Sequence, residues 1–152
     1  MIKGKQSIAF KASPYIEESA SVVGKKEGEG PLGSRFDMVG LDDMFGEDTW
    51  EKAESSMQKE ACQLALGKAH LTAGAIRYLF GGDLLRQGVA TSLGVEQLQI
   101  PMFGLYGACS TMGEALSLGA MCVNAGYAQN VIAIASSHFA SAEKQFRYPL
   151  EY

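Results

Sequence analysis

The hydrophobic positions in the second half of the chain alternate between apolar runs and segments with helical spacing. The runs end in glycines or small polar residues and predict strands buried on both faces of a parallel sheet, at residues 76–82, 100–106 and 131–136. Residues 89–98 and 110–125 predict helices, and the second of them stops at Gly126. Strand, helix and strand within about 35 residues predict a parallel βαβ unit.

The first half of the chain is less regular. A weak alternation over residues 7–12 predicts a first strand, and residues 24–48, with six glycines and many charges, predict a long irregular loop. Loops of this length are usually functional or contact another chain. The following helix has Asp48 as its expected cap and Glu51 as the second half of a capping box. Its expected buried stripe consists of Trp50, Ala53, Met57, Ala61 and Leu64.

The helix predicted at residues 110–125 is apolar around its whole circumference, and Glu114 is its only charged residue. A helix of this kind is buried on all sides, so it should lie between two layers. The chain is short of the mass that two layers need. We therefore expect a partner, or a part of the protein beyond this chain, to cover the helix. The sequence after residue 136 supports the second expectation, because it stops without a closing element.

Composition and charge exclude several classes of protein. The chain has 152 residues, which suits one domain, and a net charge of −4 without a basic stripe argues against nucleic-acid binding. Three widely spaced cysteines, without a C-x-x-C motif or a secretory signal, argue against a disulfide scaffold and a structural metal site. They favour a reducing, intracellular setting. No run of about 18 apolar residues predicts a membrane span.

Cys109, in the segment LYGACST, follows a predicted strand and opens the apolar helix. The unsatisfied N–H groups of a helix N-terminus stabilise a thiolate, so Cys109 has the setting of a nucleophile. A cysteine that attacks a thioester also needs a base and an oxyanion site. The alternatives are a cysteine that lines a pocket without reacting and a small buried cysteine.

A cysteine at such a turn, followed by a central buried helix, resembles the thiolase superfamily. Five motifs together are similar to the stage V sporulation protein AD family, along nearly all of the chain: GPLG at 30–33, GDLL-x-Q at 82–87, IP at 100–101, LYGACST at 105–111 and SSH-x-x-x-AE-x-QFRYP at 136–149. The resemblance implies an α/β fold in which residues 1–152 form the N-terminal thiolase-like half. That half would have a mixed, mostly parallel sheet, a buried central helix after Cys109, and a second half that is absent here.

The resemblance also implies a function. The family is implicated in moving dipicolinic acid, pyridine-2,6-dicarboxylate, into the developing spore, and its members are regarded as binding proteins of a channel system. We therefore expect a non-catalytic dipicolinate-binding protein, in the cytoplasm or forespore and peripheral at the spore inner membrane. Its partners would be the other proteins of the channel, and a homodimer through the sheet edge is implied too. The alternatives are a Cys109-dependent acyltransferase or ketoacyl synthase-like enzyme and a truncated fragment without activity.

The candidate site residues follow strands whose carboxyl ends meet at one edge of a parallel sheet. Asp83 either orients an arginine or holds a calcium ion that bridges to dipicolinate, or it caps the next helix. His138 is either a partner for the dicarboxylate or a histidine that satisfies loop carbonyls. Arg147 could grip a carboxylate with its planar fork, or be an exposed structural arginine. Gln87 and Ser110 could donate hydrogen bonds. Calcium apart, no cofactor or metal is expected.

Overall fold

The computed structural model describes residues 1–147, and its centre is a three-stranded parallel sheet in the order β6–β5–β7. The strands are β5 (Tyr78–Gly82), β6 (Met102–Gly104) and β7 (Val131–Ala135). Leu79 of β5 lies beside Met102 of β6 and Ile132 of β7. The parallel α/β sheet predicted from the three apolar runs is confirmed, with each strand shorter than its run.

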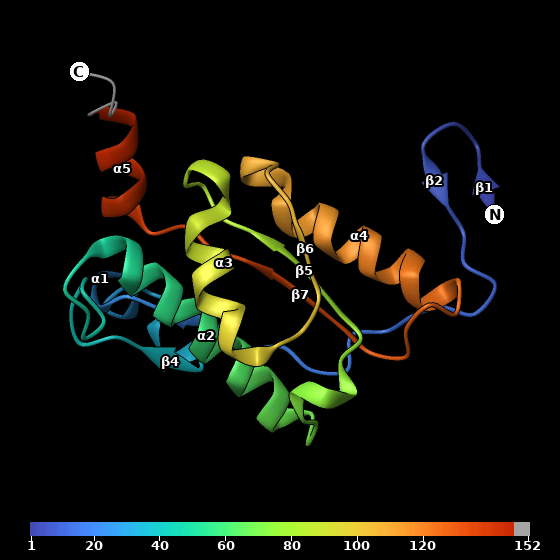
Figure 1. Cartoon of the computed structure of the whole chain (residues 1–152), viewed down its shortest axis with the longest axis horizontal. Coiled ribbons are helices and arrows are strands. Elements are labelled where there is room, and N and C mark those ends of the chain that lie inside the picture. The colour runs from blue at the N-terminus through green and yellow to red at the C-terminus, as the bar shows by residue number, and fades with distance from the viewer. Residues whose placement is uncertain (148–152) are drawn as a thin grey trace.

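Helices cover both faces of this sheet (Figure 1). On one face, α4 (Thr111–Asn124) packs against β5 and β7. On the other face, α2 (Trp50–Lys68) packs against β7 and along α3 (Val89–Val95), which a 3-10 turn at Glu96–Leu98 extends. The core between α2, α3 and the sheet is built around Leu79, and its buried members are Cys62, Leu66, Ile76, Leu79, Val95, Ile100 and Ile134.

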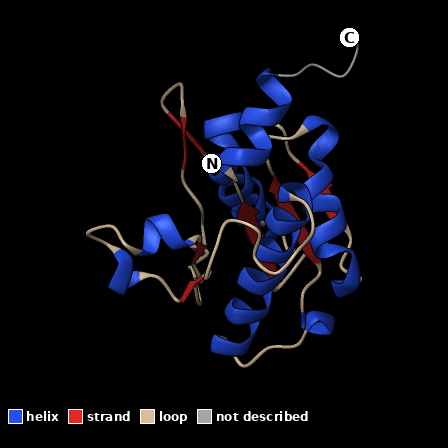
Figure 2. Ribbon diagram, turned by 90° about the vertical axis from the view of Figure 1, so that its left-hand side faces the viewer, coloured by secondary structure: helices blue, strands red, loops and turns tan. Residues whose placement is uncertain are grey.

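The remaining elements are short. Strands β1 (Ile2–Lys3) and β2 (Ser7–Ile8) form an antiparallel hairpin, so the strand expected over 7–12 is wrong beyond its first two residues. The expected loop over 24–48 contains α1 (Lys25–Gly28), a 3-10 turn (Gly33–Arg35) and β4 (Met38–Val39). Strand β4 pairs in parallel with β3 (Val22–Val23). This segment stands out to one side of the molecule, at the left in Figure 2.

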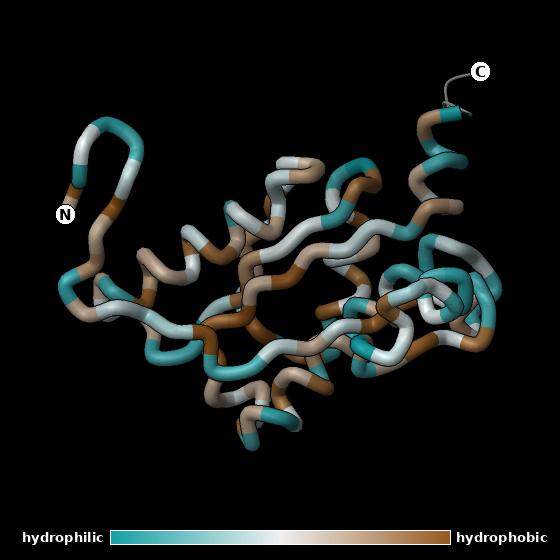
Figure 3. The backbone as a smooth tube through the Cα atoms, turned by 180° about the vertical axis from the view of Figure 1, so that it is seen from behind, coloured by the Kyte–Doolittle hydropathy of each residue, from teal (hydrophilic) through white to brown (hydrophobic). Residues whose placement is uncertain are grey.

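Three further elements connect or close the core. A 3-10 turn (Ala73–Ala75) precedes β5, another (Arg86–Gly88) precedes α3, and α5 (Phe139–Arg147) follows β7. The last two residues of the RYP motif, 148 and 149, lie outside the described residues. Figure 3 shows the hydrophobic stretches of backbone running through the middle of the molecule, whereas the turn of the N-terminal hairpin is hydrophilic.

Helix α2 differs from its prediction at its start and along its buried face. Its cap is Thr49, whose hydroxyl accepts a hydrogen bond from the Lys52 N–H at 3.2 Å, whereas Asp48 forms an ion pair with Lys52 at 2.8 Å. The capping box that begins at Asp48 is therefore wrong. The shorter threonine hydroxyl reaches the free N–H group while the carboxylate meets the lysine one turn on.

The buried face of α2 is rotated from the predicted apolar stripe. Only Ala53 of that stripe is fully buried, and the side chains that face the core are Ala53, Glu54, Ser55, Gln58, Cys62 and Leu66. Glu54 and Gln58 are 1% and 2% exposed. Buried polar side chains are tolerated where hydrogen bonds replace water, so tertiary contacts outweigh apolar periodicity here.

Helix α4 is buried on one side only. Thr111, Ala115 and Gly119 face the sheet, and Gly119 lies so close that an added Cβ would stand 3.0 Å from Val131 Cγ2. Large apolar side chains elsewhere around the helix are exposed, namely Met112, Leu116, Leu118 and Met121. The part of the chain that the structure describes therefore does not bury this helix on all sides, and its covering by a partner or by a part of the protein beyond this chain stays a prediction.

Candidate functional site

The carboxyl ends of β5, β6 and β7 meet at one edge of the sheet. Gly82, at the end of the central strand β5, lies between the ends of β6 and β7. The Gly82 carbonyl accepts a hydrogen bond from the Ser136 N–H at 3.2 Å, just past the end of β7. A Cβ added to Gly82 would lie 2.0 Å from the carbonyl oxygen of Leu105, just past the end of β6. Glycine at position 82 therefore allows the three connections that carry the candidate residues to converge.

Cys109 lies in the tight turn between β6 and α4, where the sequence places it. The turn is a 3-10 helix over Ala108–Ser110, and Cys109 is exposed. Ala108 has a φ of +48°, a left-handed conformation that is uncommon for a residue with a Cβ. The Ser110 N–H and hydroxyl both donate to the Gly107 carbonyl, at 2.9 and 2.8 Å. The turn presents Cys109 outward at the start of α4.

A carboxylate lies against this turn. The Ser110 hydroxyl is 2.8 Å from Oε1 of Glu114, and a Cβ added to Gly107 would lie 2.5 Å from the same oxygen. Its negative charge lies near the positive end of the α4 dipole, and so opposes the binding of a bare anion there. Sequence analysis missed Glu114 as a site residue, although the Ser110–Glu114 spacing of four residues along a helix is a signal for such a contact.

Asp83 is buried and holds the connection between β5 and α3. One carboxylate oxygen accepts from the Leu85 N–H at 2.8 Å. The other accepts from the N–H and the hydroxyl of Thr91, at 2.7 and 2.5 Å. The carboxylate is 1% exposed, so it fixes the conformation of this connection from inside.

Gln87 lies on that connection, in a left-handed conformation with a φ of +61°, and its side chain lines a cavity of about 230 Å³. The cavity lies between the start of α3 and the segment that leads from β6 to Cys109. Its lining is Gly81, Gln87, Gly88, Thr91, Ser92, Met102, Gly104, Leu105 and Tyr106. Within the described part of the chain, these residues are uncharged and offer an amide and several hydroxyl groups. Tyr106, whose hydroxyl lies 3.4 Å from the Leu84 carbonyl, is a second residue that sequence analysis missed.

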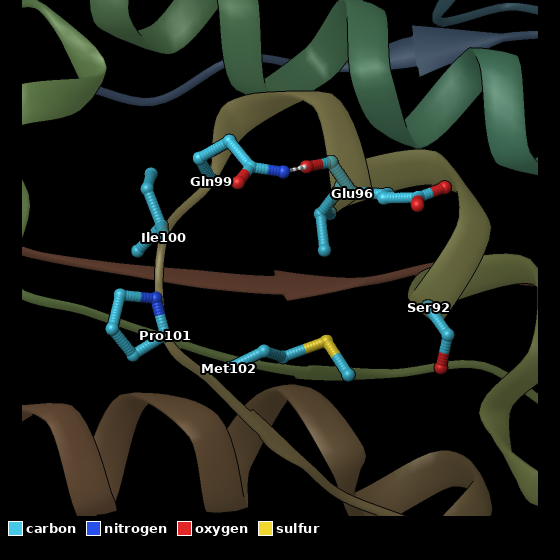
Figure 4. A pocket seen from close by; sticks show the side chains of 7 residues that line it. Ser92, Glu96, Gln99, Ile100, Pro101 and Met102 are labelled. Atoms are coloured by element: carbon cyan, nitrogen blue, oxygen red, sulfur yellow. Dashed lines mark hydrogen bonds between the residues drawn. The ribbon is translucent and has the colours of Figure 1, made fainter.

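A larger and more open depression lies at the start of β6 (Figure 4). It has a volume of about 320 Å³ and is lined by Ser92, Val95, Glu96, Gln99, Ile100, Pro101 and Met102. Pro101 and Met102 give it apolar surface, and the Gln99 amide donates to the Glu96 carbonyl at 2.8 Å. It lies away from the Cys109 turn, and ligands of parallel sheets bind at the carboxyl ends of the strands. We therefore assign the candidate site to the smaller cavity beside Cys109.

His138 lies on the connection after β7, and both its ring nitrogens have partners. Nε2 is 2.7 Å from the Asp43 carbonyl, and Nδ1 accepts from the Ser141 N–H at 3.4 Å. These contacts assign the ring hydrogen to Nε2. His138 therefore joins the start of α5 to the segment 24–48.

Arg147 is the last residue of α5, is exposed, and pairs with Glu143 one turn earlier. The structure thus brings Cys109, Ser110 and Gln87 around one edge of the sheet. Asp83 lies beneath that edge, while Arg147 lies apart from it. Helix α5 reaches the connection before α3 through Gln145, whose Oε1 accepts from the Arg86 N–H at 2.9 Å.

Comparisons with known proteins agree with the motifs. A family model described as stage V sporulation protein AD matches residues 4–152. The stage V sporulation protein AD of Bacillus subtilis (strain 168) is 40% identical over 152 residues, which cover 99% of this chain and 45% of that protein. The chain therefore spans less than half the length of this relative. Among residues 1–147, no helix is both long and apolar enough to cross a bilayer.

Proposed function

Because this chain belongs to the stage V sporulation protein AD family of sporulation proteins, we propose that it binds dipicolinate and supports uptake of this dicarboxylate into the developing spore. The observation that carries the proposal is the cavity between Gln87 and Tyr106, directly beside the Cys109 turn. The family is expected to bind a small planar diacid. This chain has a small cavity at the edge of the sheet where ligands of parallel sheets bind.

The chemistry of the cavity supports binding by neutral donors. The Gln87 amide and the rotatable hydroxyls of Ser92 and Tyr106 can donate to carboxylate oxygens, and Leu105 and Met102 offer apolar surface to the pyridine ring. Glu114 repels a bare dianion, which favours a ligand accompanied by a cation. Calcium suits this role because it prefers carboxylate oxygens, and Glu114 is an exposed carboxylate at the turn.

The surroundings of Cys109 support binding rather than catalysis. A cysteine nucleophile needs a base within hydrogen-bond reach, and both nitrogens of His138 are engaged by Asp43 and Ser141. In this proposal Cys109 follows the segment that lines the cavity and does not react.

Acyl transfer by Cys109 is the second candidate function. It is favoured by the exposure of Cys109 at a strained turn before α4, because strain gathers at functional sites. Mass spectrometry after incubation with acyl-coenzyme A tests it. An acyl group on Cys109 that is absent from Cys109→Ala would favour the enzyme, and an unmodified Cys109 would count against it.

We further propose that the chain is the N-terminal half of a thiolase-like fold and that the second half packs on the outer side of α4. The exposed Met112, Leu116, Leu118 and Met121 support this proposal, as does the additional length of the relative. Apolar patches of this kind mark interaction surfaces. In the spore, the protein would lie at the inner membrane through contacts with other proteins of the dipicolinate channel.

Isothermal titration of dipicolinate, with and without calcium, tests the proposed function. We expect saturable one-to-one binding that weakens about tenfold in Gln87→Ala, since an amide donor to a charged acceptor contributes about 1.5 kcal/mol or more. Gln97→Ala, at an exposed position outside the cavity, is the matched control. The B. subtilis relative serves as the longer comparator. Absence of binding in both proteins would contradict the proposal.

A further inference from the structure

A buried network of hydrogen-bonded polar side chains, called the polar network below, links the two connections that flank the candidate site. It passes through α2. Its members are Asp83, Thr91, Gln58, Ser136, Glu54 and Ser141. Apart from Ser136, which is partly exposed, these side chains are fully buried or nearly so. Neither Glu54 nor Gln58 belongs to the cavity or to the Cys109 turn, and neither is part of the apolar stripe predicted for α2.

In the polar network, each hydrogen bond has a defined donor and acceptor. The Gln58 amide nitrogen donates to the Thr91 hydroxyl at 3.0 Å and to the Ser136 hydroxyl at 2.5 Å. Each hydroxyl has one hydrogen, and each passes it to a carboxylate. Thr91 donates to Asp83 at 2.5 Å, and Ser136 donates to Glu54 at 2.6 Å. The amide of Gln58 therefore bridges two carboxylates through two hydroxyl groups.

A flip of the Gln58 amide, which exchanges its nitrogen and oxygen, would break this arrangement. A carbonyl oxygen in place of the nitrogen would need hydrogens from Thr91 and Ser136, and these are already donated to the carboxylates. In the observed orientation the Oε1 atom of Gln58 has no hydrogen-bond partner within the described residues. A buried, unpartnered carbonyl is costly, so the two donated bonds are what favours glutamine at this position.

The second carboxylate extends the link to α5. The other oxygen of Glu54 accepts from the Ser141 hydroxyl at 2.8 Å, and that hydroxyl also lies 3.0 Å from the carbonyl of His138. One end of the polar network thus fixes the β5–α3 connection, which carries Gln87. The other end fixes the β7–α5 connection, which carries His138.

We propose that Glu54 and Gln58 are positioning residues that hold the β5–α3 and β7–α5 connections in fixed positions relative to each other. Loosening one connection therefore loosens the other. Their effect on ligand binding rests on the proposed function, whereas the coupling itself does not. A rigid second layer of hydrogen bonds is what keeps binding groups in place.

Amide hydrogen exchange of the apo protein tests the coupling without any ligand. In Gln58→Leu we expect about tenfold faster exchange, the effect of losing one hydrogen bond, at the amides of both Thr91 and Ser136. The amides of β5 itself should keep their protection. Gln63→Leu makes the same change on the exposed side of α2 and should leave both connections unchanged. Glu54→Gln, with Glu60→Gln as its control, should act in the same way on Ser136 and Ser141.

Faster exchange in one connection only, a uniform rise across the whole molecule, or no change would overturn the coupling. If Gln58→Leu fails to fold, Ser136→Ala removes the same bridge from its other end and must loosen the amide of Thr91. Titration of dipicolinate into the same variants then tests the effect on the ligand. If the unaltered protein does not bind, the proposed function fails, and the exchange result still decides the coupling.

Discussion

Two cysteines of this chain have opposite surroundings, and their reactivities should differ accordingly. Cys62 is 1% exposed, and burial raises the pKa of its thiol to about 12, whereas Cys109 is exposed at the start of α4. At pH 8 a thiol with this pKa is ionised in about one molecule in ten thousand. We expect a maleimide to modify Cys109 in the folded protein and to spare Cys62.

Peptide mapping by mass spectrometry checks this difference. Unfolding in urea should make both cysteines react, which serves as the control. Modification of Cys62 at a rate comparable with Cys109 in the native protein would show that the core between α2 and the sheet opens readily, contrary to the buried position found here.

At the level of single residues, sequence located Cys109 correctly but not the groups around it. The turn follows from local signals, because an apolar strand, small residues and a helix occur in order. Glu114 contacts Ser110 one helical turn earlier, whereas Tyr106 meets the Leu84 carbonyl of a distant connection only after folding. Asp83 is similar, since a sequence does not say whether an acid after a strand faces solvent or its own backbone.

Among the elements, helix α2 shows why periodicity alone gives the wrong face. The predicted stripe selected apolar residues, whereas the buried side of α2 carries Glu54 and Gln58. Their partners Thr91, Ser136 and Ser141 come from three distant segments. The strands and α4 lie in mainly apolar segments, and they were predictable because no such long-range polar network competes with hydrophobic burial there.

The β3–β4 segment is joined to α2 by a pH-dependent contact. Lys68 donates to Asp37 at 2.9 Å and to the Ser19 carbonyl at 2.5 Å. The hydrogen bond from Lys68, with others from Ser21, lowers the pKa of Asp37. A lowered pKa in the folded state adds stability above the unfolded value of about 4, and this stability is lost as the pH falls through the folded value.

Replacing Lys68 by methionine should raise the titration midpoint of Asp37 and loosen residues 21–39 at neutral pH. Carboxyl chemical shifts followed by NMR over an acid titration measure the midpoint. Lys52→Met removes a comparable surface pair, with Asp48, and should leave Asp37 unaffected. An unchanged Asp37 midpoint in Lys68→Met would mean that the contact does not form in solution.

For the molecule as a whole, the exposed side of α4 is the feature that a separate domain would not normally present. The apolar side chains of Met112 and Leu116 on this helix are 41% and 42% exposed. We expect this chain to bind a hydrophobic dye and to self-associate at high concentration. Replacing both residues by lysine should suppress both properties with little loss of stability, because both side chains are more than a third exposed.

Light scattering coupled to size-exclusion chromatography measures the association. Lysine at Ala115, which is fully buried against the sheet, is the contrasting variant and should unfold the helix instead. A compact, stable monomer that binds no dye would argue against the need for a second half on α4.

Backbone NMR of the chain during titration with dipicolinate would locate the site most directly. Binding beside the Cys109 turn predicts saturable shifts of the amides of Gly88, Leu105, Tyr106 and Cys109, with Gln99 and Ile100 at the other depression unchanged. The largest shifts at Gln99 and Ile100, or on the outer side of α4, would contradict the assignment of the site to the carboxyl ends of β5 and β6.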